Sequence, residues 1–187
     1  MDMTCAGDLM GLVVAISSCA APVLLCGRPL RVSVMQALFL CAVFYNFLAI
    51  INSFFFLLPG AGVDAENFHR AAESVVDGTG ERALGIGTNL YISFLSLVYE
   101  VFGPSRFLGS QLSIMAMMLG LVVIDKILLY IGAEKGRVPV ILVFGLSPAV
   151  LLFVPYTMRE AYQFLFFALS SYALLRLLAR PCVFRFF

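Results

Sequence analysis

Long apolar runs dominate this sequence and limit it to one class of fold. Hydrophobic residues make up 62% of its 187 residues and charged residues only 12%, whereas a soluble domain has about 45–50% apolar and about 25% charged residues. An apolar run of about 20 residues is long enough for a helix to cross a bilayer. Lipid offers no partners for backbone polar groups, so these runs must be helical. We therefore predict a single all-α, polytopic membrane bundle.

Five runs have the composition of transmembrane helices, and glycine, proline or charged residues separate them. The predicted spans cover about 9–26, 34–58, 108–131, 138–155 and 159–178. The polar stretch between the second and third spans, 59–107, is the only long segment that these helices leave outside the membrane.

The first part of this outer segment predicts an amphipathic helix over 65–76. Asp64 is its expected N-cap, Val63 and Phe68 form a hydrophobic staple around the cap, and the glycine-rich sequence 77–80 ends the helix.

A second helix is predicted over 85–102, where polar residues recur every three or four positions and form one stripe. The stripe comprises Asn89, Ser93, Ser96 and Glu100. This helix either lies in the membrane interface, with Leu90, Phe94, Leu97 and Val101 toward lipid or protein, or is a short span with a polar face.

The positions of lysine and arginine predict the topology. If 85–102 stays on one side, eight of the 12 basic residues fall toward the cytoplasm. The four outside are Arg70, Arg82, Arg106 and Arg159. The N-terminus is then outside and the C-terminus is cytoplasmic.

The sequence lacks the features that mark several classes of function. The net charge is +1, without a run of like charges, so a nucleic-acid partner is not expected. The chain contains no glycine-rich nucleotide loop, no HExxH and no GxSxG.

Glu66, His69 and Glu73 share one face of the predicted helix 65–76. Their spacing resembles carboxylate–histidine metal sites, but the chain has a single histidine and so no complete ligand set for a resident metal. We predict a solvated face with pairs from Glu66 to Arg70 and from His69 to Glu73. A weak site for one divalent cation is the alternative.

The joint before the last span carries a second polar group. Thr157 and Glu160 have the spacing of a capping box. Arg159, at a helix N-terminus on the outer side, either binds phosphate or another anion, or extends toward the membrane interface.

Asp125 lies within the third predicted span, beside Lys126. An ionisable residue inside the membrane needs a buried partner or a proton. A structural contact and a proton-handling role, as in a small transporter, are both open.

The sequences 63–72, 90–92, 102–106 and 148–175, the last including Thr157-Met158-Arg159-Glu160, together resemble the N-terminal part of GT-C superfamily membrane glycosyltransferases. That group includes the protein O-mannosyltransferases and the lipid A aminoarabinose transferases. The resemblance implies a bacterial cytoplasmic membrane enzyme that takes a sugar from a polyprenyl phosphate.

Carried over by position, the resemblance makes Asp64 the catalytic carboxylate, either as general base or assisting a divalent cation. Arg159 would face the lipid phosphate, and Glu160, His69 and Glu66 are the other candidate substrate-binding residues. Members of the superfamily have more spans, so the chain is expected to be a partial product, or a small relative that has lost activity or needs a partner membrane subunit. A non-catalytic membrane scaffold is the alternative function.

Overall fold

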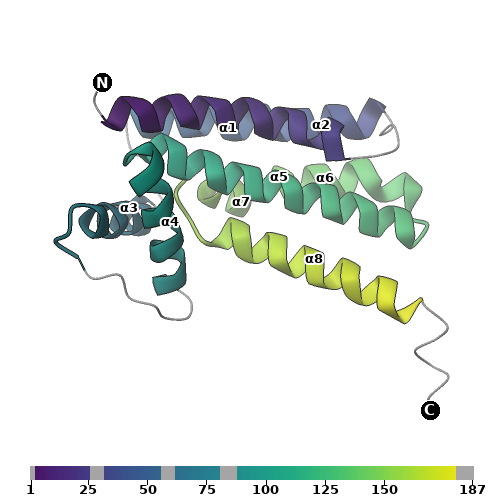
Figure 1. The fold of residues 1–187 in the computed structure, drawn as a ribbon. Coiled ribbons are helices and arrows are strands. Elements are labelled where there is room, and N and C mark those ends of the chain that lie inside the picture. The colour runs from purple at the N-terminus through teal and green to yellow at the C-terminus, as the bar shows by residue number, and fades with distance from the viewer. Residues whose placement is uncertain (1–2, 26–31, 56–61, 81–87, 180–187) are drawn as a thin grey trace, which may run out of the picture.

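The computed structural model describes residues 3–25, 32–55, 62–80 and 88–179, and these form helices joined by short turns (Figure 1). The helices are α1 (Met3–Leu25), α2 (Val32–Phe54), α3 (Gly62–Val76), α4 (Thr88–Phe102), α5 (Arg106–Tyr130), the 3-10 turn η1 (Glu134–Gly136), α6 (Arg137–Gly145), α7 (Pro148–Phe153) and α8 (Glu160–Leu178). No strand occurs within these ranges, which confirms the all-helical prediction for the described residues.

Three of the described helices, α2, α5 and α8, are long and apolar enough to cross a membrane. The predicted number of five spans is not supported. Shorter apolar helices lie at Cys5–Ala20, within α1, and at Thr88–Phe102, which is α4. The chain is therefore a multi-pass membrane protein by length and composition.

Close contacts at glycine show that α1 and α5 run in the same direction. A Cβ atom at Gly7 would lie 2.8 Å from the carbonyl oxygen of Gly103, and one at Gly11 would lie 2.7 Å from the ring of Phe107. Two glycines four residues apart let helix backbones approach closely in membranes. The N-terminal ends of α1 and α5 consequently lie side by side (Figure 1).

Helix α8 is also parallel to α5. Near the start of both helices, the hydroxyl of Ser113 on α5 donates a hydrogen bond to the carbonyl of Met158 and accepts one from its amide. About two turns further along, a Cβ atom at Gly120 would lie 2.6 Å from the ring of Phe164. The segment between α5 and α8 must therefore return across the bundle.

This return segment is broken, and the prediction of one continuous helix over 138–155 is wrong. Helix α6 ends at Gly145, and α7 begins at Pro148. Ser147 is extended (φ −61°, ψ 142°) and its hydroxyl accepts a hydrogen bond from the amide of Val150. The cause is Pro148, because proline pushes the preceding residue out of the helical region and suits the first turn of a new helix.

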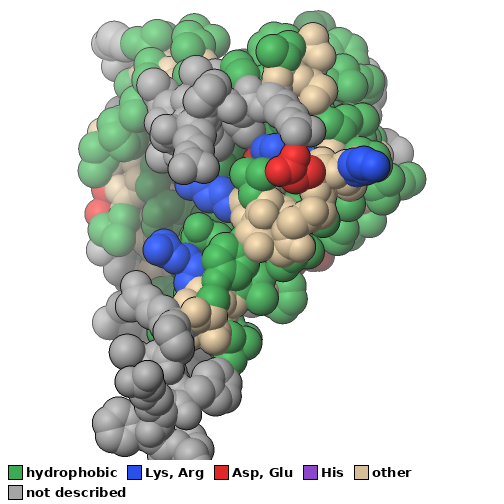
Figure 2. All heavy atoms as spheres, turned by 90° about the vertical axis from the view of Figure 1, so that its right-hand side faces the viewer, with side chains coloured by type: hydrophobic (Ala, Val, Ile, Leu, Met, Phe, Trp, Pro, Cys, Tyr) green, Lys and Arg blue, Asp and Glu red, His purple; other side chains and the backbone are tan. Residues whose placement is uncertain are grey.

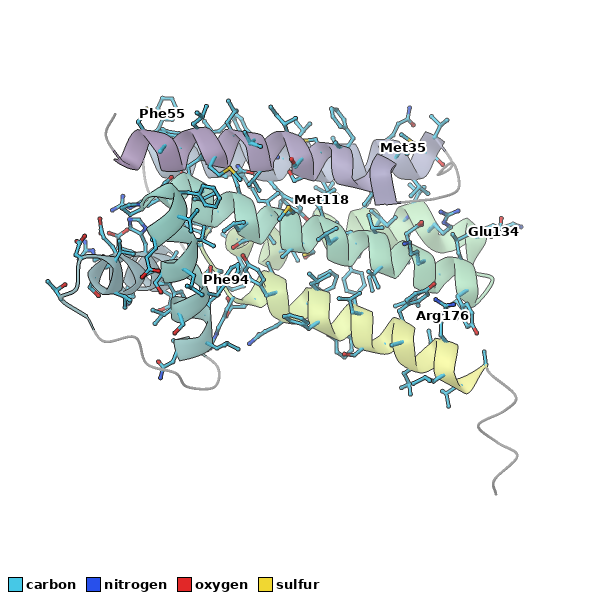
Figure 3. All side chains as sticks on the ribbon, viewed as in Figure 1. Met35, Phe55, Phe94, Met118, Glu134 and Arg176 are labelled. Atoms are coloured by element: carbon cyan, nitrogen blue, oxygen red, sulfur yellow. The ribbon has the colours of Figure 1, made fainter. Side chains whose placement is uncertain are left out.

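The main core lies between α2, α5 and α6. Cys41, Tyr45, Leu121 and Ile141 are fully buried there, and Met118 projects from α5 into the same interior (Figure 3). The Tyr45 hydroxyl donates a 2.6 Å hydrogen bond to the carbonyl of Gly145. This bond satisfies a carbonyl at the end of α6, where the helix stops.

Helix α4 runs across the ends of the long helices, next to α3 (Figure 1). Its polar stripe turns inward in the middle, where Ser93 and Ser96 are buried, while Leu90 and Val101 are 65% and 72% exposed. This arrangement agrees with a helix in the membrane interface whose apolar side meets lipid.

The opposite end of the bundle carries η1 and the end of α8, where Glu134 and Arg176 project (Figure 3). Figure 2 shows lysine and arginine side chains across this end. Here Asp125 and Arg137 form a buried, bidentate ion pair, with both nitrogen–oxygen distances 2.7 Å. Of the two roles left open for Asp125, the structure shows the buried contact.

Candidate functional site

Polar side chains from four parts of the chain meet where α1, α5 and α8 begin. Helix α3 supplies Glu66 and His69, α4 supplies Tyr99, and Arg106 opens α5. The fourth part is the connection before α8, in which Tyr156, Thr157 and Met158 are all buried. We call this group the outer cluster.

A chain of hydrogen bonds links α3 to α4 and α5. His69 Nδ1 lies 2.9 Å from the Tyr99 hydroxyl, and this hydroxyl donates to the Ser105 carbonyl at 3.0 Å. Ser105 caps α5 by accepting from the amide of Leu108, and its hydroxyl donates to Asp8 of α1 at 2.6 Å. Four helices are thus joined through one buried path.

These bonds determine the tautomer of His69. The single hydroxyl proton of Tyr99 is committed to a carbonyl, which can only accept, so His69 Nδ1 must be the donor to the tyrosine. The basic atom of neutral His69 is therefore Nε2. It lies 4.0 Å from Glu73 Oε2.

The environment of His69 opposes its protonation. The residue is 8% exposed, and its burial lowers its pKa. The nearby guanidinium groups of Arg106 and Arg70 lower the pKa further, and the carboxylates of Glu73 and Glu66 counteract only part of the change. His69 is therefore neutral near pH 7.

Glu66 is shared by two arginines. Its Oε1 atom lies 2.8 Å from Arg70 Nε and 2.7 Å from Arg106 Nη2. Burial alone would raise the pKa of Glu66, but the hydrogen bond from Arg70 and the charges of both arginines lower it. Glu66 is an anion that fastens α3 to the start of α5.

The predicted solvated face on α3 is therefore wrong for two of its residues. The pair of Glu66 with Arg70 is present, but the Glu66 side chain is only 14% exposed and His69 is buried. The face turns inward because α4 and α5 supply partners that the sequence spacing does not reveal. Within the described residues, no group of three or more His, Cys, Asp or Glu side chains could hold a metal ion.

The connection before α8 is fixed to α5 rather than capping α8. The Thr157 hydroxyl contacts the Arg106 carbonyl at 3.5 Å, and a Cβ atom at Gly109 would lie 2.6 Å from that hydroxyl oxygen. Helix α8 begins at Glu160, with Arg159 as its N-cap residue and without a side-chain cap. The predicted capping box from Thr157 to Glu160 is therefore wrong, because the Thr157 hydroxyl contacts α5 instead of the amides of α8.

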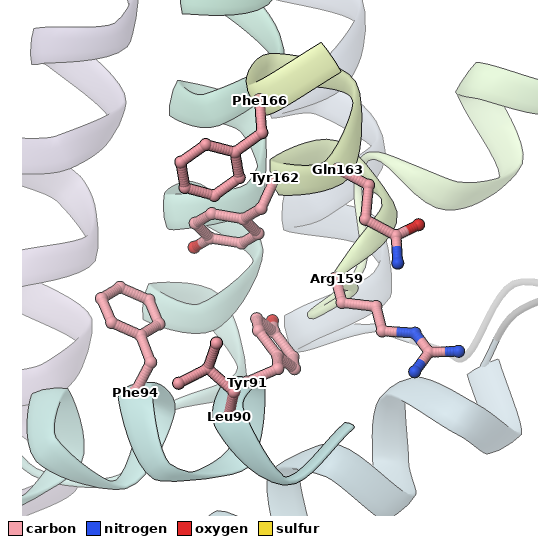
Figure 4. A pocket seen from close by; sticks show the side chains of 7 residues that line it. All are labelled: Leu90, Tyr91, Phe94, Arg159, Tyr162, Gln163 and Phe166. Carbon is pink, nitrogen blue, oxygen red and sulfur yellow. The ribbon is translucent and has the colours of Figure 1, made fainter. Parts of the chain in front are cut away.

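A groove of about 410 Å³ opens beside the outer cluster, between α4 and α8. Its walls are mainly apolar and aromatic, and its lining residues are Leu90, Tyr91, Phe94, Arg159, Tyr162, Gln163 and Phe166. Figure 4 shows the rings of Phe94, Tyr162 and Phe166 gathered together, with Arg159 extending away from them. Arg159 donates to the hydroxyl of Thr88 at the start of α4. We call this space the α4–α8 groove.

The other two predicted site residues, Asp64 and Glu160, lie close to the outer cluster, in different surroundings. Asp64 is exposed in the first turn of α3. It is not an N-cap, because the helix already begins at Gly62. Its neighbour Ala65 packs on Tyr156 and Met158, which places the start of α3 against the connection before α8. Glu160 lies 3.4 Å from Arg159 through its Oε1 atom.

Sequence reasoning missed Tyr99 and Ser105 as members of the outer cluster. Tyr99 follows Ser96 by three positions and so flanks the polar stripe of α4, which is a signal because a buried tyrosine needs a partner for its hydroxyl. Ser105 precedes a long apolar run in the manner of an N-cap. The spacing of residues along the sequence does not reveal their partners on α3 and α1.

No family model, no curated protein and no solved structure matches the chain.

Proposed function

We propose that this protein is a GT-C-like membrane glycosyltransferase, or a module of one, acting on a polyprenyl-phosphate-linked sugar. The observation that carries the proposal is the α4–α8 groove with Arg159 at its rim. An apolar, aromatic wall suits a polyprenyl chain, and a guanidinium suits a phosphate through paired hydrogen bonds. A polyprenyl phosphate combines these two properties in one molecule.

The proposed orientation uses five crossings, with the N-terminus outside and the C-terminus in the cytoplasm of a bacterial cell. Helices α1, α2, α5 and α8 would each cross once, and the broken pair α6–α7 would return between α5 and α8. The parallel directions of α1, α5 and α8 support this arrangement. It puts the outer cluster and Arg159 on the extracytoplasmic face.

The proposed chemistry is a single displacement. The oxygen of an acceptor hydroxyl forms a bond to the anomeric carbon while the bond from that carbon to the phosphate oxygen breaks. The electron pair leaves with the phosphate, which Arg159 would stabilise, and the hydroxyl proton passes to Asp64 as general base. Exposure of Asp64 on the first turn of α3 leaves it accessible to an acceptor.

Glu66 and His69 take a supporting part in this proposal. Both are engaged in contacts that hold α3 on α4 and α5, so they position the start of α3, and Asp64 with it, rather than contacting a substrate.

The α4–α8 groove is tested by binding of a polyprenyl phosphate to the purified protein at fixed salt. Arg159→Ala should weaken binding about tenfold, the loss of one charge-assisted hydrogen bond. Asp64→Asn should bind normally but lose sugar transfer. Arg176→Ala, at the far end of the same helix, is the matched control. Equal binding by wild type and Arg159→Ala would reject the lipid-phosphate site.

A second candidate function is a non-catalytic scaffold for another membrane subunit, and the surface of α8 favours it. Phe166, Phe167, Leu174 and Leu177 are each more than half exposed, which leaves an apolar face for a partner helix as well as for lipid. Normal function after Asp64→Asn would support the scaffold.

A further inference from the structure

A second groove lies on the other side of the first turn of α8. Its volume is about 280 Å³, and α5, α6, α7 and α8 all contribute to it. Its walls are apolar and include Met117, Phe144, Val150, Phe153 and Phe164. We call it the α7–α8 groove. The break between α6 and α7 helps to form it, since Ser147 and Ala149 lie on its lining.

Glu160 brings one carboxylate to this apolar space. The side chain is 41% exposed, but its Oε2 atom is buried and has no hydrogen-bond partner among the described residues. A buried acceptor without a donor is costly, and more so for a charged group beside lipid. An occupant of the groove that donates a hydrogen bond to Oε2 would remove this cost.

The charges around Glu160 indicate which donor fits. Arg159 Nε lies 3.4 Å from Oε1, so the carboxylate already has one opposite charge beside it. An ammonium group would leave the site with a net positive charge, whereas a hydroxyl group completes the hydrogen bonding of Oε2 and leaves the pair neutral. The site therefore favours an uncharged donor.

We propose that the α7–α8 groove binds an amphiphile with a hydroxyl head group, whose apolar chain lies on α7 and α8 and whose hydroxyl donates to Glu160. This lipid differs in head-group chemistry from the phosphate lipid of the α4–α8 groove. The binding site stands on its own geometry. It does not depend on the proposed function, in which the acceptor hydroxyl gives its proton to Asp64.

The two grooves meet at one turn of helix. Arg159 and Glu160 are adjacent in sequence, and side chains at adjacent helical positions point about 100° apart. Arg159 lines one groove and Glu160 the other. A phosphate head group and a hydroxyl head group would thus lie at the same end of α8.

The test uses the full chain in lipid nanodiscs and hexadecanol carrying a diazirine on its chain, with cross-linked peptides identified by mass spectrometry. Hexadecanol should label α7 and the start of α8. Glu160→Met, which keeps side-chain length but removes the acceptor, should weaken labelling about tenfold. Glu134→Met, at the opposite end of the bundle, should leave it unchanged. Ala149→Phe, which fills the groove from an exposed position, should abolish it.

Two further probes distinguish the alternatives. Hexadecylammonium should compete more weakly than hexadecanol, and equal competition would reject the hydroxyl specificity. Hexadecyl phosphate should label the α4–α8 groove. If that labelling fails while hexadecanol still labels α7, the proposed function is wrong and the α7–α8 site stands. Labelling by hexadecanol that Glu160→Met and Ala149→Phe leave unchanged would overturn the inference, as would its absence from α7 and α8.

Discussion

At the scale of single residues, His69 is the group whose charge state most affects the outer cluster. It faces Glu66 and Glu73 on its own helix, Arg70 beside them, Arg106 on α5 and the hydroxyl of Tyr99 on α4. Burial and the two arginines favour the neutral form, so protonation in the folded state is unfavourable. Acid should therefore weaken the attachment of α3.

The predicted consequence is a pH-dependent stability. Because the pKa of His69 is lower in the folded state, the unfolded chain binds more protons as the pH falls below about 6.5, and the free energy of unfolding decreases over that window. His69→Gln should remove this slope while keeping a donor toward Tyr99. Unfolding in detergent between pH 7.5 and 5 measures it. An unchanged slope in the variant would assign the effect to another group.

The same residue shows where sequence reasoning reaches its limit. The pair of Glu66 with Arg70 follows from their spacing on one helix. The contact of His69 with Tyr99, 30 residues away, depends on how α3 and α4 pack, and no local pattern contains that information. Asp125 is an intermediate case: hydropathy shows that it needs a buried partner or a proton, but not which of the two, nor that the partner is Arg137.

At the scale of elements, glycine sets how closely the helices approach. The contact of Gly7 is the least forgiving, since the nearest atom to an added Cβ is the backbone oxygen of Gly103, which cannot rotate away. The adjacent Asp8 bonds Ser105. A larger residue at Gly7 should therefore push α1 away from the start of α5 and disturb this bond.

Gly7→Ala should lower the stability of the protein by about 1–3 kcal/mol, the usual cost of overpacking. The midpoint of thermal unfolding in detergent measures the effect. Gly136→Ala is the control, because a Cβ atom at Gly136 meets nothing within 4 Å. Equal midpoints for the two variants would mean that α1 and α5 can separate without loss.

The break between α6 and α7 is a feature that mean hydropathy does not detect. The residues of 138–155 are apolar on average, and their mean hydropathy therefore predicts one span. Ser147-Pro148 is nevertheless a recognisable helix start, with a capping hydroxyl followed by proline at the first helical position. Local chemistry at two residues decided the structure of this segment, not its mean composition.

At the scale of the whole molecule, the two ends of the bundle differ in kind. One end carries α3, α4 and the outer cluster; the other carries η1 with exposed Glu134 and Lys135 and, nearby, the buried pair of Asp125 with Arg137. The excess of lysine and arginine at the second end predicts that it faces the cytoplasm.

Cysteine labelling in intact cells tests this orientation. It uses a variant of the protein in which the five native cysteines are replaced. Asp77→Cys, exposed at the end of α3, should react with a membrane-impermeant maleimide. Lys135→Cys, exposed in η1, should react only after the membrane is permeabilised. The reverse pattern would place the outer cluster in the cytoplasm and exclude a polyprenyl-phosphate sugar donor on the outer face.

The buried pair of Asp125 with Arg137 also bears on how the chain enters the membrane. The two residues are only 12 positions apart, on consecutive helices joined by a tight turn. Either charge alone would be costly at this depth, but together they are neutralised within a single hairpin. Helices α5 and α6 are thus expected to leave the translocon together, with the second helix required before the first is stable in lipid.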